Sequence, residues 1–296
     1  MAGKYTVAVT GATGRVGGQV VAQLTGIEGI QVRALARDPA AASATLGPAA
    51  EVAGADLTEP STLAAAVDGA DAVFLVFPSV TADAAARDVV AELTGSGRRV
   101  VYLSAHGVPD EPDHRAEPGG GILGSHAHLE GLIAASAAEY TFLRASGFAA
   151  NTLAWAPQIQ HSDVVRWFVP DARRALVHEA DLAAVGVLAL TQPGHDRKAY
   201  HLTGPEQLTQ VAQLAAIGDA LGRSLRWESV DSAAELFPGM PATVAESIVA
   251  GHAAMVTHPE PVTDTVARLT GRPARSFAQW AHDHTGDFTT APPRPA

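Results

Sequence analysis

The stretch "YTVAVTGATGRVGG", Tyr5–Gly18, decides the fold. An apolar, β-branched run ends in a glycine-rich turn, and the residues that follow have the pattern of a helix that stops near Gly26. Glycines in the GxxGxxG spacing permit a tight turn, a close approach of the backbone to a pyrophosphate, and close packing of helix on strand. The N–H groups at the start of the helix also attract an anion. The loop therefore predicts a dinucleotide site with these residues at the cofactor: Gly11, Thr13, Gly14, Arg15, Val16 and Gly17.

Length, charge and composition narrow the class of protein. At 296 residues the chain can bury a large core, and with 47% hydrophobic and 17% charged residues it does not have the composition of a disordered chain. The net charge of −11 makes nucleic acid a poor partner. The absence of cysteine excludes disulfides, thiolate catalysis and cysteine-ligated zinc, and indicates a cytoplasmic protein. The first strand begins too early to leave room for a signal peptide, and the longest apolar run, 70–80, is too short to span a membrane.

Strand and helix patterns alternate along the first half of the chain. Strand patterns occupy 30–37, 70–78, 98–107 and 139–148, and helix patterns occupy 15–26, 58–69, 81–97 and 125–137. This alternation predicts right-handed crossovers and an α/β fold with a doubly wound parallel sheet of Rossmann type. Beyond residue 150 the alternation loosens. We therefore expect an NADP-binding Rossmann domain over 1–150, a smaller, mostly helical substrate lobe over 151–288 interleaved with the last strands, and a disordered tail over 289–296.

The end of the second strand indicates which dinucleotide is bound. An NAD site usually has an acidic residue about 20 positions beyond the glycine loop, on the ribose 2′-hydroxyl. Here Arg37 stands 20 positions after Gly17, and Arg15 lies within the loop. Two guanidinium groups favour the 2′-phosphate of NADP(H), because each can make charge-assisted bonds to it. Two alternatives stay open: a shift of one residue would put Asp38 at the acidic position, or Arg37 is only solvated at the strand end.

Further blocks of sequence resemble the atypical short-chain dehydrogenase/reductases of the NmrA-like branch. The blocks are "TGATGRVG", "VRALARDP", "ADLTEPSTLAAAVDGADAVFLV", "VVYLSAHG", "LEGLIAASAAEYTFLRASGFAAN", "HEADLAAVGVLALT" and "AYHLTGPEQLT", in the family's order over roughly residues 5–215. That family includes NAD(P)H-dependent quinone and carbonyl reductases, and also regulators that bind the cofactor without turnover. The resemblance implies contacts to adenine from Asp56 and Leu57, to ribose from Phe77, Pro78 and Ser79, and to nicotinamide from Gly147 and Phe148.

The resemblance also shows which catalytic group is missing. The parent superfamily uses a serine, a tyrosine and a lysine, and Ser104 in "VVYLSAHG" matches the serine. Aligning "GGGILGSHAHLEG", Gly119–Gly131, on Glu130 puts His126 at the lysine position and Ile122 at the tyrosine position. The sequence keeps the hydroxyl and loses the general acid. The usual proton relay is therefore excluded.

Three sources of stabilisation could replace the tyrosine. Ser104 could donate one hydrogen bond to the developing alkoxide. His126, with a reference pKa of about 6.5, could stabilise negative charge or pass a proton. A substrate with a phenol beside its ketone could carry its own acid. The structural alternatives are that Ser104 caps the strand end, that His126 packs against the cofactor without moving protons, and that His106, which could face the substrate, is solvated.

The expected partner is therefore a flat, hydroxylated aromatic ketone or a quinone. Trp155, Trp167 and Phe168 could line an apolar pocket for such a substrate, or pack in a core. No metal site is predicted, because His126 and His128 are two apart on a helix and face different ways. The oligomeric state is left open.

Two functions fit these observations. The first is an NADPH-dependent reductase that reduces a ring carbonyl of an aromatic polyketide-like ketone or quinone, as in antibiotic biosynthesis, with Ser104, His126 and the substrate's own acid. The second is an NADP-binding redox-sensing regulator without turnover, which would account directly for Ile122. The retained serine and a lobe able to hold a small molecule favour the enzyme. A dehydrogenase, epimerase or other nucleotide-sugar activity is a third, weaker alternative.

Overall fold

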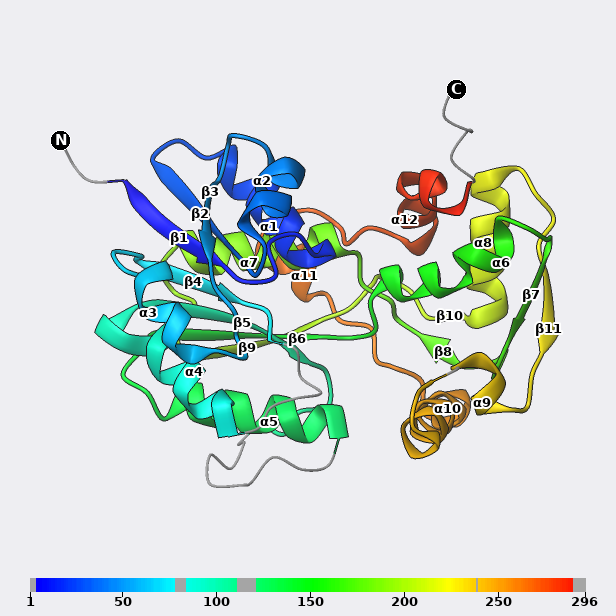
Figure 1. Cartoon of the computed structure of the whole chain (residues 1–296). Helices are drawn as coiled ribbons and strands as arrows, with labels where there is room; N and C mark the ends of the chain where they lie inside the picture. Colours follow the sequence, from blue (N-terminus) through cyan, green and yellow to red (C-terminus); the bar gives the residue numbers. More distant parts are fainter. Residues whose placement is uncertain (1–3, 78–83, 111–120, 238, 290–296) are drawn as a thin grey trace. The chain divides into compact units, whose positions relative to one another are not determined.

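The computed structural model describes residues 4–77, 84–110, 121–237 and 239–289, in two compact units (Figure 1). Unit 1 comprises Met1–Ala145, Glu179–Leu202 and Arg268–Gly271; unit 2 comprises Ser146–His178, Thr203–Ala267 and Arg272–Ala296. The chain thus leaves unit 1 after residue 145, whereas the predicted boundary followed residue 150, and it later returns for a helix and a strand. Apart from Thr289, the predicted tail lies outside the described residues.

A seven-stranded sheet forms the centre of unit 1. Its order is β3-β2-β1-β4-β5-β6-β9, and all six pairings are parallel. The strands are β1 (Tyr5–Val9), β2 (Ile30–Ala36), β3 (Glu51–Gly54), β4 (Ala72–Leu75), β5 (Arg99–Ala105), β6 (Tyr140–Ala145) and β9 (Lys198–Leu202). The strand order reverses between β1 and β4, which is where such sheets bind their ligands. The predicted doubly wound Rossmann-type fold is confirmed.

Helices cover both faces of this sheet (Figure 1). α1 and α7 pack together on one face, and α4 and α5 pack together on the other. The helices of unit 1 are α1 (Arg15–Thr25), α2 (Pro39–Leu46), α3 (Leu63–Ala66), α4 (Ala84–Thr94), α5 (Gly121–Ala134) and α7 (Glu179–Thr191). The sequence placed α7 in the C-terminal lobe; the structure puts it in unit 1, because its apolar surface is buried against α1, β4, β5 and β6.

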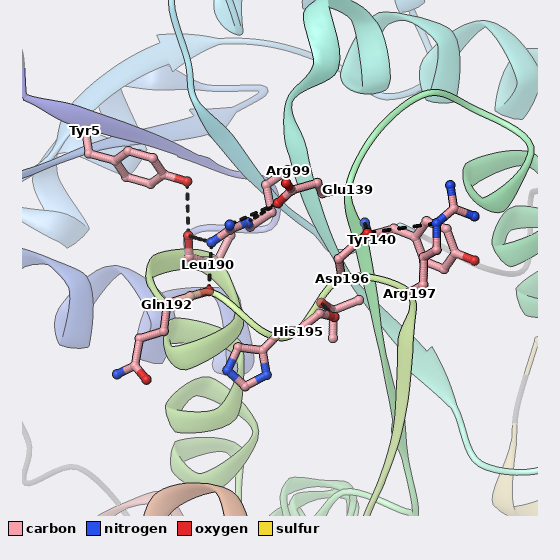
Figure 2. Close-up of polar contacts among 10 residues, drawn as sticks. Tyr5, Arg99, Glu139, Tyr140, Leu190, Gln192, His195, Asp196 and Arg197 are labelled. Carbon is pink, nitrogen blue, oxygen red and sulfur yellow. Dashed lines mark hydrogen bonds and ion pairs between the residues drawn. The ribbon is translucent and has the colours of Figure 1, made fainter.

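Polar contacts close the N-terminal edge of the sheet around the end of α7 (Figure 2). Arg99, the first residue of β5, donates to the carbonyl oxygens of Leu190 (3.2 Å) and Gln192 (2.9 Å). The Tyr5 hydroxyl donates to the same Leu190 oxygen at 3.1 Å. The last carbonyls of a helix have no partner within it, and here β1 and β5 supply one. The other end of the sheet, where the strands finish, remains available for a ligand.

Unit 2 is smaller and contains two short sheets, one antiparallel pair β10-β8 and one parallel pair β11-β7. Its strands are β7 (Val164–Trp167), β8 (Arg173–Arg174), β10 (Leu208–Thr209) and β11 (Arg226–Ser229), and its helices are α6 (Ala156–Ile159), α8 (Gln210–Leu221), α9 (Ala233–Leu236), α10 (Ala242–Thr257) and α12 (Phe277–Asp283). α11 (Thr265–Thr270) has residues in both units. Trp155, Phe277, Trp280 and Phe288 form much of the core of unit 2. None of the helices in the described ranges combines the length and the apolar character needed to cross a membrane.

Candidate nucleotide-binding and active site

The turn between β1 and α1 can only be built with glycine at its decisive positions. Gly11 has φ +59°, in the left-handed region that favours glycine, and its carbonyl accepts from Gly14 N at 2.8 Å. A Cβ on Gly17 would overlap the backbone carbonyl of Gly11, and one on Gly14 would lie 3.1 Å from the same oxygen. Gly14 precedes α1 and offers no side-chain cap. No side chain of these glycines covers the first N–H groups of α1, so a pyrophosphate can approach them closely.

A cavity of about 750 Å³ opens beside this turn, entirely within unit 1. Residues that follow the carboxyl ends of four neighbouring strands line it: Thr10, Gly11 and Thr13 after β1, Arg37 and Asp38 after β2, Asp56, Leu57 and Thr58 after β3, and Val76 after β4. This is the crevice in which doubly wound sheets bind nucleotides, and its volume is that of a site for a large ligand. Five of the predicted cofactor residues line it: Gly11, Thr13, Arg37, Asp56 and Leu57.

Arg37 and Asp38 have different surroundings. The Asp38 carboxylate is the N-cap of α2 and accepts from Ala40 N and Ala41 N, both at 3.0 Å. Arg37 is exposed at the cavity wall. The pKa of Asp56 is lowered mainly by hydrogen bonds from Thr58, with a smaller contribution from the positive charge of Arg37. Both residues border the cavity, but Oδ1 of Asp38 is engaged with the start of α2.

The other predicted cofactor residues lie in varied places. Arg15 is the exposed first residue of α1, and Val16 is buried beneath it. The Phe77 side chain is 6% exposed and packs in the core beneath the sheet. Pro78 and Ser79 lie outside the described residues. Gly147 and Phe148 belong to unit 2, where the absence of a side chain on Gly147 leaves room for the guanidinium of Arg174.

Ser104, the first catalytic candidate, is buried in a charged network. It is 2% exposed, and its hydroxyl donates to Glu130 Oε1 at 2.5 Å. Arg144, 1% exposed, donates to both oxygens of Glu130, at 3.1 and 2.8 Å, and to Asp110 Oδ1 at 2.7 Å. The side chain of Glu130 is fully buried. The serine hydroxyl therefore stabilises a buried carboxylate in this structure.

His126, the second candidate, faces the same side of the sheet. Tyr102 and Ser104 are two apart on β5, His126 and Glu130 are four apart on α5, and each pair shares one face. The Tyr102 hydroxyl lies 2.6 Å from His126 Nδ1. Burial lowers the pKa of His126 to about 4 and raises the pKa of Tyr102 well above 10. A neutral histidine donates at one ring nitrogen and accepts at the other, so the tautomer of His126 decides which group donates in this pair.

The low pKa of His126 predicts a loss of stability in mild acid. Between pH 6.5 and 4 the unfolded chain binds a proton that the folded chain excludes, so the free energy of unfolding decreases as the pH falls through this window. From pH 7 to pH 5 the contribution of His126 to this decrease is about 2 kcal/mol, at about 1.4 kcal/mol per pH unit below 6.5. Urea unfolding at the two pH values measures it. His126→Gln, which keeps an acceptor for Tyr102, should reduce the difference, and the exposed His258→Gln should not; equal differences would contradict the assignment.

A histidine pair that the sequence did not predict lies at the carboxyl edge of the sheet. His106 follows β5, His201 lies in β9, and their Nδ1 atoms are 3.1 Å apart, so one ring donates and the other accepts. Burial, with the charges of His106 and Arg144, lowers the pKa of His201. The register brings Ser104, Arg144 and His201 side by side on adjacent strands. The sequence pattern alone did not contain the strand order or the register that brings these residues together.

A reversed strand order, a glycine turn that exposes a helix start, and a nucleotide-sized cavity define a Rossmann-type dinucleotide-binding protein. A family model described as NAD(P)H-binding matches residues 11–193, more than half of the chain. The chain therefore belongs to this NAD(P)H-binding family. The structure of NmrA, a negative transcriptional regulator, has the same fold, with a TM-score of 0.69 and 19% identity over 96% of each chain.

Relatives match the chain from end to end. A (4-alkanoyl-5-oxo-2,5-dihydrofuran-3-yl)methyl phosphate reductase from Streptomyces griseus is 38% identical over 95% of this chain and 99% of its own length. An NAD(P)H azoreductase from Xenophilus azovorans is 31% identical over 96% of this chain and 100% of its own. The structure of an NADPH-dependent quinone oxidoreductase from Escherichia coli, complexed with NADPH, is similar with a TM-score of 0.78 and 26% identity, over 94% of this chain and 99% of the other.

Proposed function

We propose that the protein is an NADPH-dependent reductase whose substrate is a quinone or another flat, conjugated carbonyl compound. The main support is the glycine turn before α1, which lies beside a cavity lined by Arg37. The chain also matches named reductases over almost its whole length. The protein is an NAD(P)H-dependent oxidoreductase, and its substrates are small molecules. A regulator without turnover is not favoured, since the likeness to NmrA extends to the fold alone.

The missing tyrosine favours acceptors whose reduced form needs no strong acid. NADPH supplies the hydride; a quinone that takes up this hydride and one proton becomes a hydroquinone. The hydroquinone anion is a phenolate, whose conjugate acid resembles tyrosine with a pKa of about 10. The alkoxide from a plain ketone is a far stronger base, closer to hydroxide. A phenolate needs a strong acid far less than an alkoxide does, and water can supply its proton. A quinone reductase with Ile122 at the tyrosine position therefore loses little rate.

The roles proposed for Ser104 and His126 are restricted by their contacts. Ser104 can stabilise an oxyanion only when its hydroxyl leaves Glu130. His126 is neutral at pH 7 and has its Nδ1 engaged with Tyr102, so any proton it passes involves that hydrogen bond or its other ring nitrogen. Ser104 and His126 are therefore candidates for a supporting role, with an acceptor whose reduced form needs no strong acid. The ring carbonyl of an aromatic polyketide of the hydroxylated kind, which carries its own phenol, meets the same requirement.

NADPH oxidation followed at 340 nm tests this function. The panel should hold simple quinones, phenol-bearing bicyclic ketones, plain aryl ketones and aliphatic ketones. Turnover is expected with the first two groups, with Ser104→Ala and His126→Ala retaining at least about a tenth of it, since the acceptor supplies most of the anion stabilisation. Tight NADPH binding without turnover on any acceptor would establish the regulator instead.

Arg37 should set the preference for NADPH over NADH. A charge-assisted hydrogen bond to the 2′-phosphate contributes about 1.5–3 kcal/mol. Arg37→Ala is therefore expected to lower the ratio of NADPH to NADH affinity by about tenfold or more, with NADH affinity nearly unchanged. Arg33→Ala removes the same charge from β2, but Arg33 pairs with Glu51 and does not line the cavity, so the ratio should stay as in the wild type. Calorimetric titration of both variants checks this, and an unchanged ratio in Arg37→Ala would refute it.

A further inference from the structure

Unit 2 contains a cavity of its own, of about 220 Å³. Four of its thirteen lining residues are tryptophan or phenylalanine, although such aromatic residues with tyrosine make up only 5% of the chain: Trp155, Trp167, Phe168 and Phe237. A cavity filled by chance from this composition would contain fewer than one. The aromatic residues of unit 2 are therefore concentrated around an open space as well as in its core.

Most of these rings meet edge to face, and Trp167 and Phe168 are tilted against each other. The Phe168 ring centroid lies 5.8 Å from that of Phe237 and 5.1 Å from that of Trp167, with interplanar angles of 61° and 31°. His252 closes the group, 5.0 Å from Phe168 and at 80° to it. Walls of this kind pack against a planar ring, for which they offer both faces and edges.

Arg174 and His252 add polar side chains to the lining. The Arg174 guanidinium donates to Glu260 Oε1 at 2.9 Å and lies 3.3 Å from His252 Nε2. Glu260 neutralises the positive charge, so this lining suits a neutral carbonyl or phenol better than a phosphate.

The backbone next to Phe168, one of the aromatic lining residues, is strained and is held by hydrogen bonds. Val169, directly after Phe168, has φ +46°, a left-handed conformation that is a genuine outlier for a β-branched residue. The buried Gln210 side chain donates to the carbonyl oxygens of Phe168 and Val169, both at 2.8 Å. Strain kept by a dedicated contact is a feature of ligand sites, and Gln210 also lines this cavity.

The volume limits the ligand to one or two rings. A dry cavity of about 150 Å³ accommodates benzene, and pockets for larger molecules begin at about 300 Å³. We propose that this cavity binds a planar one- or two-ring aromatic compound that carries a carbonyl or phenol oxygen. The inference rests on the proposed function in taking that ring as part of the reducible substrate. A bicyclic naphthoquinone fits the cavity, and a fused three-ring system exceeds it.

Calorimetric titration with 2-methyl-1,4-naphthoquinone, without NADPH, tests the cavity directly. The chain has no cysteine, so the quinone cannot be lost to thiol adducts. One saturable site is expected in the wild type. Ala154→Phe, at an exposed residue that lines the cavity, should weaken binding at least about tenfold by filling it. Ala215→Phe, at an exposed position of α8 that does not line it, should bind as the wild type does. Phe237→Ala, which removes one wall, should also weaken binding.

The outcomes separate the cavity from the proposed function. No saturable binding in the wild type, equal binding by Ala154→Phe, or equally tight binding of the three-ring anthraquinone-2-sulfonate would overturn the inference. If Ala154→Phe abolishes naphthoquinone binding but no acceptor oxidises NADPH, the proposal for the cavity holds and the proposed reductase function is wrong. If Ala154→Phe turns over its acceptor with an unchanged KM, the reductase function holds and the proposal for the cavity is wrong.

Discussion

Replacing Gly17 by alanine is expected to weaken NADPH binding by at least about a hundredfold. The added Cβ would overlap the Gly11 carbonyl, which is backbone and cannot rotate away. Gly11 in turn accepts from Gly14 N, so the displacement spreads through the turn that exposes the first N–H groups of α1. Losing two charge-assisted bonds of about 1.5–3 kcal/mol each to the pyrophosphate gives this factor. Calorimetric titration with NADPH measures it.

Gly18 provides the matched control for Gly17. It lies next to Gly17 in the same helix, but its Cβ would meet only the Ala12 carbonyl at 3.4 Å, an ordinary contact. Gly18→Ala should keep wild-type NADPH affinity and raise stability by about 0.5–1 kcal/mol, because alanine is the better helix former. Wild-type affinity in Gly17→Ala as well would mean that this turn does not hold the cofactor's phosphates.

The glycine turn and the sheet could be predicted because their physical requirements are visible as periodic patterns. Each buried strand is an apolar run, and the glycine spacing has few other uses. Two elements were missed beside the cofactor cavity. α2 is a run of small residues without a polar and an apolar face, and β3 has only four residues. The start signal of α2 was nevertheless present, because Asp38 before Pro39 is a cap followed by a first-turn proline.

The predicted helix over 58–69 also came out differently. The structure has a 3-10 turn over Pro60–Thr62 followed by the short α3. Thr58, the first residue of that stretch, donates through its backbone and hydroxyl to Asp56 Oδ1, both at 2.8 Å. Propensity favours a continuous helix in this alanine-rich stretch, but Asp56 and Thr62 bind the intervening backbone into a loop. Local side-chain bonds of this kind compete with helix formation.

The catalytic candidates show a different limit of the sequence. Alignment on Glu130 gave positions along β5 and α5 but not the partners of the side chains. Strand and helix periodicity places Tyr102 with Ser104 and His126 with Glu130 on shared faces, yet only the packing of α5 on the sheet shows that these faces meet. Arg144, on the next strand β6, then completes the network as the partner of Glu130.

Removing the buried carboxylate of Glu130 is expected to cost about 3–5 kcal/mol of folding free energy. Glu130→Ala leaves the 1% exposed guanidinium of Arg144 with only the exposed Asp110 and the Pro109 carbonyl, so a buried charge loses its main partner. The Ser104 hydroxyl loses its acceptor at the same time. Guanidinium chloride unfolding of the wild type and the variant, compared at pH 7, measures the difference.

Glu139→Ala is the control, because it breaks an ion pair of the same chemistry at the surface of the same sheet. Glu139 is 53% exposed, and Arg99 keeps its bonds to the Leu190 and Gln192 carbonyls, so the cost should stay below about 1 kcal/mol. Similar costs for the two variants would mean that Glu130 is solvated and that Ser104 is free to face a ligand. A large difference would mean that the serine hydroxyl belongs to the core, and that any activity lost in Ser104→Ala must be separated from its loss of stability.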